Sequence, residues 1–171
     1  MQVLLTLAVV PRLSAATIGL NFLRGAGADV ANVQNGVANS LAATDTAGAP
    51  AYAQANWNNL GCRGTNIVLV DSTGASSGVT VNWDASGGWS QSGGGTPATQ
   101  LSPDGNLMNS YLDSNGNGNT TFNANLWANS NNNKPLVHFS GLSAWMAAQG
   151  VTAYDIVIYS DGDDAGGRTA R

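Results

Sequence analysis

Carboxylate and amide side chains that could coordinate a cation open a short loop beyond the middle of the chain. Residues 113–118 read D-S-N-G-N-G, which matches the opening of a calcium loop with Asp113, Asn115 and Asn117 as ligands. The twelfth position of such a loop needs a bidentate Glu and here is Ala124, so a true EF-hand is excluded. Two interpretations stay open: a weaker calcium site completed from elsewhere, or an Asn-Gly turn that binds nothing.

A second acidic loop lies near the end of the chain. Asp161, Asp163 and Asp164 fall within residues 160–167, which also hold three glycines. Carboxylates this close repel one another unless a cation or solvent screens them, and glycine lets a backbone bend around an ion. This cluster therefore predicts either a calcium site or a solvated loop.

Aromatic side chains outside the expected strands offer a different chemistry. Trp89, Tyr111 and Trp127 each stand close to Asn, Asp, Gly or Ser residues. Sugars present apolar C–H faces that stack on aromatic rings, and hydroxyls that pair with amides and carboxylates. These three residues form the candidate ligand-binding set, and the alternative is that the same rings cap the hydrophobic core.

Candidates for acid–base catalysis are few. Glu is absent, and the one histidine, His138, lies in an apolar run where partial burial is expected. A glycosidase needs two carboxyl groups about 5 to 10 Å apart. The pair that the sequence offers is Asp155 with Asp161 or Asp84. Residues 74–78 match the serine-hydrolase pattern G-x-S-x-G but join two expected strands, not a strand and a helix, so we predict no enzyme.

Alternating apolar residues predict the strands that must position these side chains. The organising strand is residues 154–159, YDIVIY, which runs directly into the second acidic loop. The apolar run at residues 66–70 predicts a central strand buried on both faces, and residues 79–83 form a hairpin with it. Further strands are expected at residues 17–23 and 135–140.

Two short helices and two long loops complete the expected outline. A helix over residues 141–149 would end at Gly150, because glycine readily adopts the left-handed conformation that closes a helix. Residues 106–112 predict a second short helix or turn with its apolar side on the core. Residues 25–50 and 84–103, rich in Gly, Ser, Ala and Asn, predict surface loops, the second of them mobile.

The composition is typical of an exported protein. Only 9% of the 171 residues are charged, and Asn, Gly, Ser, Thr and Ala fill positions that Lys and Glu take on intracellular surfaces. The formal net charge of -4 and the single lysine, Lys134, argue against a nucleic-acid partner. Cys62 is alone, so an internal disulfide is excluded.

The first residues have the hydrophobic and cleavage regions of a secretory signal peptide. Residues 1–16 contain an apolar run at positions 3–10 and small residues at Ser14 and Ala16. No basic residue precedes the run, so we expect an incomplete signal, and a first strand is the alternative. Residues 17–171 are expected to form one domain without a membrane span. Because the chain stops soon after the second acidic loop, we expect it to lack its last strands.

Several stretches together resemble a recurrent type of exported domain. They are residues 17–22 (TIGLNF), 56–59 (NWNN), 69–83 (the hairpin), 107–113 (LMNSYLD), and 140–142 leading to 154–164 (YDIVIYSDGDD). The chain resembles the lectin-like jelly-roll domains of exported and surface proteins of environmental bacteria. That resemblance implies an all-β, antiparallel β-sandwich with long loops and one short helix near 141–149, as well as secretion and glycan binding.

These observations predict a secreted, noncatalytic module for glycan binding or surface adhesion. Its partner would be a glycan or cell-surface polysaccharide, and calcium is the candidate cofactor. One alternative is a structural spacer of an extracellular matrix, filament or cell-surface assembly, and a lesser one is a fragment of a secreted glycoside hydrolase. A spacer would show no selective glycan binding, whereas a lectin would lose its binding when Trp89 or Trp127 is removed.

Overall fold

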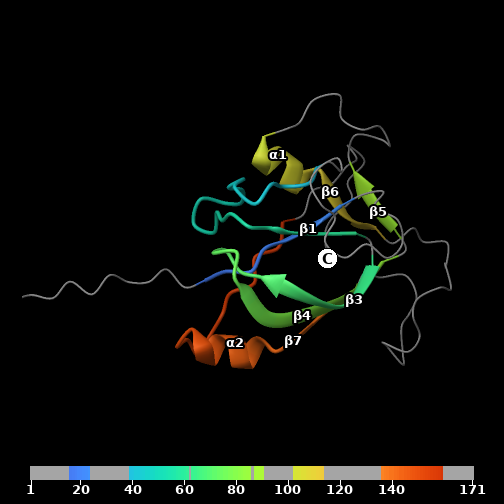
Figure 1. The fold of residues 1–171 in the computed structure, drawn as a ribbon. Helices are drawn as coiled ribbons and strands as arrows, with labels where there is room; N and C mark the ends of the chain where they lie inside the picture. The colour runs from blue at the N-terminus through green and yellow to red at the C-terminus, as the bar shows by residue number, and fades with distance from the viewer. Residues whose placement is uncertain are drawn as a thin grey trace, which may run out of the picture.

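Strands dominate the architecture of the protein. The computed structural model describes residues 16–23, 39–61, 63–85, 87–90, 102–113 and 136–159, and within them the chain forms three small sheets and two short helices (Figure 1). The predicted all-β class is confirmed at this level. The predicted signal peptide lies outside the described residues, except for its last position, Ala16.

The largest sheet contains the hairpin that the sequence predicts. Strands β3 (Arg63–Val70), β4 (Ser76–Asp84) and β7 (Leu136–Ser140) are antiparallel neighbours in the order β3-β4-β7. The turn between β3 and β4 is closed by Asp71, whose Oδ1 accepts hydrogen bonds from the backbone N–H groups of Thr73 at 2.9 Å and Ala75 at 3.3 Å. Such a turn, stabilised by its own carboxylate, is a strong local signal for a hairpin.

The expectation that residues 66–70 form a central strand buried on both faces is wrong. Strand β3 is an edge of its sheet, and β4 is the central strand. Leu69 is fully buried, whereas Val68 is 49% exposed. The register with β4 also shifts between Gly64 and Ile67, where Asn66 adopts a left-handed conformation with φ of 54°.

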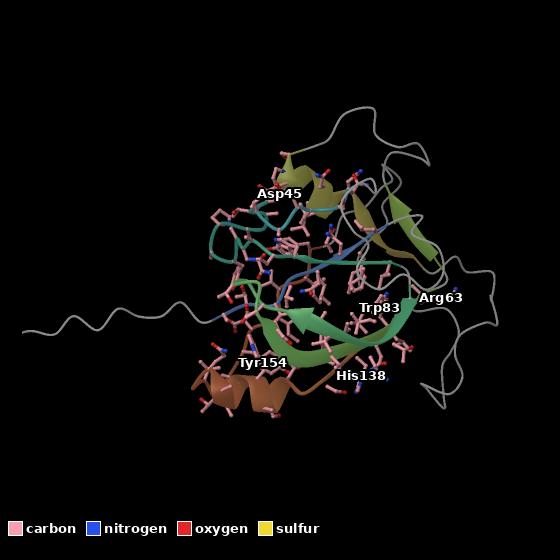
Figure 2. The ribbon with its side chains drawn as sticks, viewed as in Figure 1. Asp45, Arg63, Trp83, His138 and Tyr154 are labelled. Carbon is pink, nitrogen blue, oxygen red and sulfur yellow. The ribbon has the colours of Figure 1, made fainter. Side chains whose placement is uncertain are left out.

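The main hydrophobic core lies between the three-stranded sheet and a parallel pair of short strands. Strands β1 (Leu20–Phe22) and β2 (Asn58–Leu60) form that pair, and β1 lies within the strand predicted at residues 17–23. Their parallel pairing departs from the predicted sandwich, in which all strands are antiparallel. The buried members of the core come from β2, β3 and β4: Leu60, Leu69, Val79, Val81 and Trp83. In Figure 1 the sheet β3-β4-β7 lies below β1, and Figure 2 shows Trp83 on the same sheet.

Trp83 is the largest side chain of this core and explains a nearby glycine. Its indole Nε1 donates to the carbonyl of Gly61 at 2.9 Å, and its ring lies 6.4 Å from that of Phe22. A Cβ at Gly64, directly across the hairpin, would overlap the Trp83 ring. Glycine at that position therefore leaves room for the indole.

The helices follow local signals in the sequence. Helix α2 (Leu142–Ala148) ends as predicted at Gly150, where φ is 68° and the N–H groups of Gly150 and Val151 bond to the carbonyls of Ala147 and Met146. Helix α1 (Pro103–Met108) begins earlier than predicted and is followed by a strand. Its start is fixed by Ser102, whose Oγ accepts from the Gly105 N–H at 3.1 Å, and by a proline in the first turn.

The strand expected to organise the chain, residues 154–159, is not a strand in the structure. The segment is assigned to no strand and pairs with none of the described residues. Ile156 is 73% exposed and Ile158 is 80% exposed, so its apolar residues do not join the main core. The alternating pattern is correct for a strand, but the described part of the chain supplies no partner for it.

Tyr159 nevertheless holds the end of this segment against a second, smaller core. That cluster contains Leu41, Ala47, Trp57 and Leu107, and Tyr159 packs against it. The rings of Trp57 and Tyr159 meet edge to face with centroids 6.2 Å apart, and the Tyr159 hydroxyl accepts from the Ala49 N–H at 2.9 Å.

Candidate functional site

Two of the three aromatic residues selected from the sequence occupy paired positions in a two-stranded ribbon. Strands β5 (Gly87–Ser90) and β6 (Ser110–Asp113) are antiparallel, and their register places Trp89 directly opposite Tyr111. The expectation of a mobile loop is therefore wrong for residues 87–90, which form β5. Strand β5 contains two glycines and lacks the usual apolar alternation, so its local strand propensity is low. Its formation depends on pairing with β6.

The ribbon is attached to the rest of the protein through β6. Leu112 is partly buried and packs against the main core. Just before β6, the Nδ2 group of Asn109 donates to Oδ1 of Asn39 at 2.9 Å, and both residues are buried. Helix α1 fixes the approach to β6 through buried Leu107. The position of Tyr111 is thus set by contacts on both sides of it in the sequence.

Asparagine side chains hold the segments beside the ribbon together. Asn59 pairs with the backbone of Leu41 in both directions: its Oδ1 accepts from the Leu41 N–H at 3.0 Å and its Nδ2 donates to the Leu41 carbonyl at 2.8 Å. Asn58 makes the same double contact with Val70, at 2.9 Å each way, and also donates to the carbonyl of Gly19. Asn58 therefore acts as a substitute peptide group between β2 and β3, and Asn59 does the same between β2 and the segment that contains Leu41.

Sequence reasoning missed this role of the asparagines. Asn21 joins the same network, because its Nδ2 donates to Oδ1 of Asn59 and to the carbonyl of Asn39, both at 2.9 Å. The available signal was the run of residues 56–59, NWNN, in which amides flank a buried tryptophan. The asparagines of this network bind backbone and one another, which leaves recognition of a ligand to other residues.

The first predicted calcium loop begins where β6 ends. Asp113 is the last residue of β6 and pairs with Gly87 at the start of β5. Its expected companions Asn115 and Asn117 lie outside the described residues, as do Trp127 and the second cluster, Asp161, Asp163 and Asp164. Within the described residues, no three His, Cys, Asp or Glu side chains gather in a way that could hold a metal ion.

The catalytic candidates occupy separate places in the fold. Ser76 is the first residue of β4 and lies opposite Val70, in a strand–strand context and not in the strand–helix elbow of a serine hydrolase. His138 was expected to be partly buried but is exposed on the edge strand β7 (Figure 2). Asp155 lies in the exposed segment after α2, and Asp84 ends β4.

No family model, no curated protein and no solved structure matches this chain. Among the helices that the structure describes, none is both long and apolar enough to cross a membrane.

Proposed function

We propose that the protein is a noncatalytic glycan-binding module of the cell surface or extracellular space, and that its ligand stacks on the β5–β6 ribbon. One observation carries this proposal. Trp89 and Tyr111 were selected for their chemistry, and they occupy directly opposed positions in the ribbon. Opposed residues of an antiparallel pair have Cβ atoms about 4.5–5.5 Å apart, so two aromatic residues at such positions can together offer a surface for a sugar ring.

The attachment of the ribbon supports the same proposal. Leu112 packs against the core, and successive positions of a strand belong to opposite faces. We therefore propose that positions 111 and 113 belong to the opposite face of the ribbon. There, the Asp113 carboxylate would accept hydrogen bonds from sugar hydroxyls or bind a calcium ion that completes the site. Calcium is therefore the proposed cofactor.

The proposal also includes the type of β-fold and the secretion of the protein. A jelly-roll sandwich of the lectin-like type is supported by two antiparallel sheets, β3-β4-β7 and β5-β6, and by a core between the first of them and the parallel pair β1-β2. Secretion is supported by the low charge and the asparagine-rich composition of the chain. A spacer of an extracellular assembly is the alternative, and it requires no ligand.

A glycan array tests this proposal with matched variants. We expect selective binding by the unmodified protein and about tenfold weaker binding by Trp89→Ala and by Tyr111→Ala, since an aromatic contact contributes about 1.5 kcal/mol. The control is Tyr52→Ala, because Tyr52 is a 42% exposed aromatic in a separate turn. Each array is run with calcium and with a chelator, and loss of binding in the chelator would identify a calcium-dependent site.

Three results would overturn the proposal. Absence of selective binding would favour a spacer. Equal loss in Tyr52→Ala and Trp89→Ala would show that the ribbon has no special role. Release of reducing sugar that disappears in Asp155→Asn would identify a glycosidase instead.

A further inference from the structure

Thr17 makes the first hydrogen bonds between the described N-terminal segment and the rest of the fold. Its N–H donates to Oγ of Ser72 at 3.3 Å, and its carbonyl accepts from the Ser72 N–H at 2.8 Å. Ser72 lies in the turn between β3 and β4, and Asn56 Nδ2 donates to the Ser72 carbonyl at 2.9 Å. In Figure 1 the blue segment passes this turn before it enters β1. Both backbone groups of Thr17 are therefore part of the fold.

The residues that follow Thr17 are equally well packed. Ile18 packs against the main core. The Gly19 carbonyl accepts from the N–H and from the Nδ2 group of Asn58, each at 2.9 Å. A Cβ at Gly19 would overlap the Trp57 ring. A protease that cut after Thr17, or further along the chain, would therefore remove contacts that the fold uses.

The sequence has a cleavage pattern at the same point. Ser14 and Ala16 are small residues at the third and first positions before the Ala16–Thr17 bond, which is the pattern of a signal-peptide cleavage site. The preceding bond, Ala15–Ala16, fits less well, because the residue at the third position before it is Leu13. The cleavage pattern and the first contacts of the fold therefore meet at one peptide bond.

We propose that a signal peptidase hydrolyses the Ala16–Thr17 bond and that Ser72 holds the new amino terminus. Water adds its hydroxyl to the carbonyl carbon of Ala16 and its hydrogen to the nitrogen of Thr17 as the C–N bond breaks. The acid proton then passes to the amine, so the products are a carboxylate and an ammonium group. The ammonium takes the place of the Thr17 N–H beside Ser72 Oγ, and a charged donor makes a stronger hydrogen bond than an amide.

N-terminal sequencing of the exported protein tests the cleavage. The whole chain is expressed in a bacterium with Gln2→Lys, which supplies the basic residue that the expected signal lacks. The exported protein should begin Thr-Ile-Gly-Leu, residues 17–20. Ala16→Leu should block this cleavage, whereas the matched control Ala15→Leu should allow it, because the middle position of the pattern accepts any residue. Cleavage at another bond, or no cleavage, would overturn the proposal.

The two amines of the mature chain test the role of Ser72. Thr17 carries one and Lys134 the other, since the chain has a single lysine. Reductive methylation with isotope-labelled formaldehyde gives each amine its own NMR signal. We expect Ser72→Ala to shift the Thr17 signal and to leave the Lys134 signal in place. This variant should fold, because it keeps the backbone bonds of position 72.

Ser143→Ala, at an exposed position of α2, is the control and should shift neither signal. A Thr17 signal that is the same in Ser72→Ala as in the unmodified protein would overturn the proposed place of the amino terminus. The inference rests on the secretion part of the proposed function. Neither experiment measures glycan binding, so its failure and a failure of glycan binding can be told apart.

Discussion

The amide of Asn58 offers the sharpest test of how the fold is held together. Asn58 is 4% exposed, and its side chain makes hydrogen bonds to the carbonyls of Gly19 and Val70 and to the Val70 N–H, each at 2.9 Å. Asn58→Ala removes all three bonds, and at about 1 kcal/mol each it should cost about 3 kcal/mol. Asn58→Asp has nearly the same shape but replaces both donors with a carboxylate facing two carbonyls, so it should cost about 4 kcal/mol or more at neutral pH.

Equilibrium unfolding in urea measures both changes. A loss of about 3 kcal/mol lowers the midpoint by about 1.5 M when the slope is about 2 kcal/mol per molar urea. The deficit of Asn58→Asp should shrink in acid, because protonation removes the buried charge and restores one donor. Gln149→Ala is the control, since Gln149 is an exposed amide at the end of α2 and its loss should cost under about 0.5 kcal/mol. The reasoning is refuted if Asn58→Asp is as stable as the unmodified protein at neutral pH.

Two glycines give further predictions. Gly64→Ala should lower the free energy of unfolding by about 1–3 kcal/mol and change the near-ultraviolet circular dichroism of tryptophan, because the new Cβ overlaps the Trp83 ring. An unchanged spectrum and stability would contradict the packing of that ring. Gly150→Ala should cost about 1 kcal/mol in thermal unfolding, because φ at this position is 68° while the space for a Cβ is open. A stability equal to that of the unmodified protein would argue against the left-handed cap.

The elements that sequence predicts well carry their own local signals. The hairpin of β3 and β4 has a polar turn between an apolar run and an alternating strand, and α2 has a glycine stop at Gly150. The elements that it predicts poorly depend on distant partners. Strand β5 contains two glycines and exists through pairing with β6, whereas residues 154–159 have every local feature of a strand but pair with no described residue. Propensity describes what a segment can form, and its neighbours decide what it does form.

The candidate site, too, could be predicted from the sequence only in part. Residue chemistry selected Trp89 and Tyr111, but only the pairing of β5 with β6 places them opposite each other. The structural role of these asparagines was missed because an amide in a sequence indicates a turn or a surface, and its use as a substitute peptide depends on which backbone lies across from it. Asn58 and Asn59 find such backbone at Val70 and Leu41.

Indole proton resonances give the most direct test of glycan binding at the ribbon. The five tryptophans should give five Nε1–H signals, which single Trp→Phe variants assign. We predict that titration with an oligosaccharide selected on the array shifts the Trp89 signal. The signals of Trp57 and Trp83, whose Nε1 groups donate to the buried carbonyls of Gln54 and Gly61, should stay in place. A Trp89 signal that does not move under saturating ligand would contradict the proposed site.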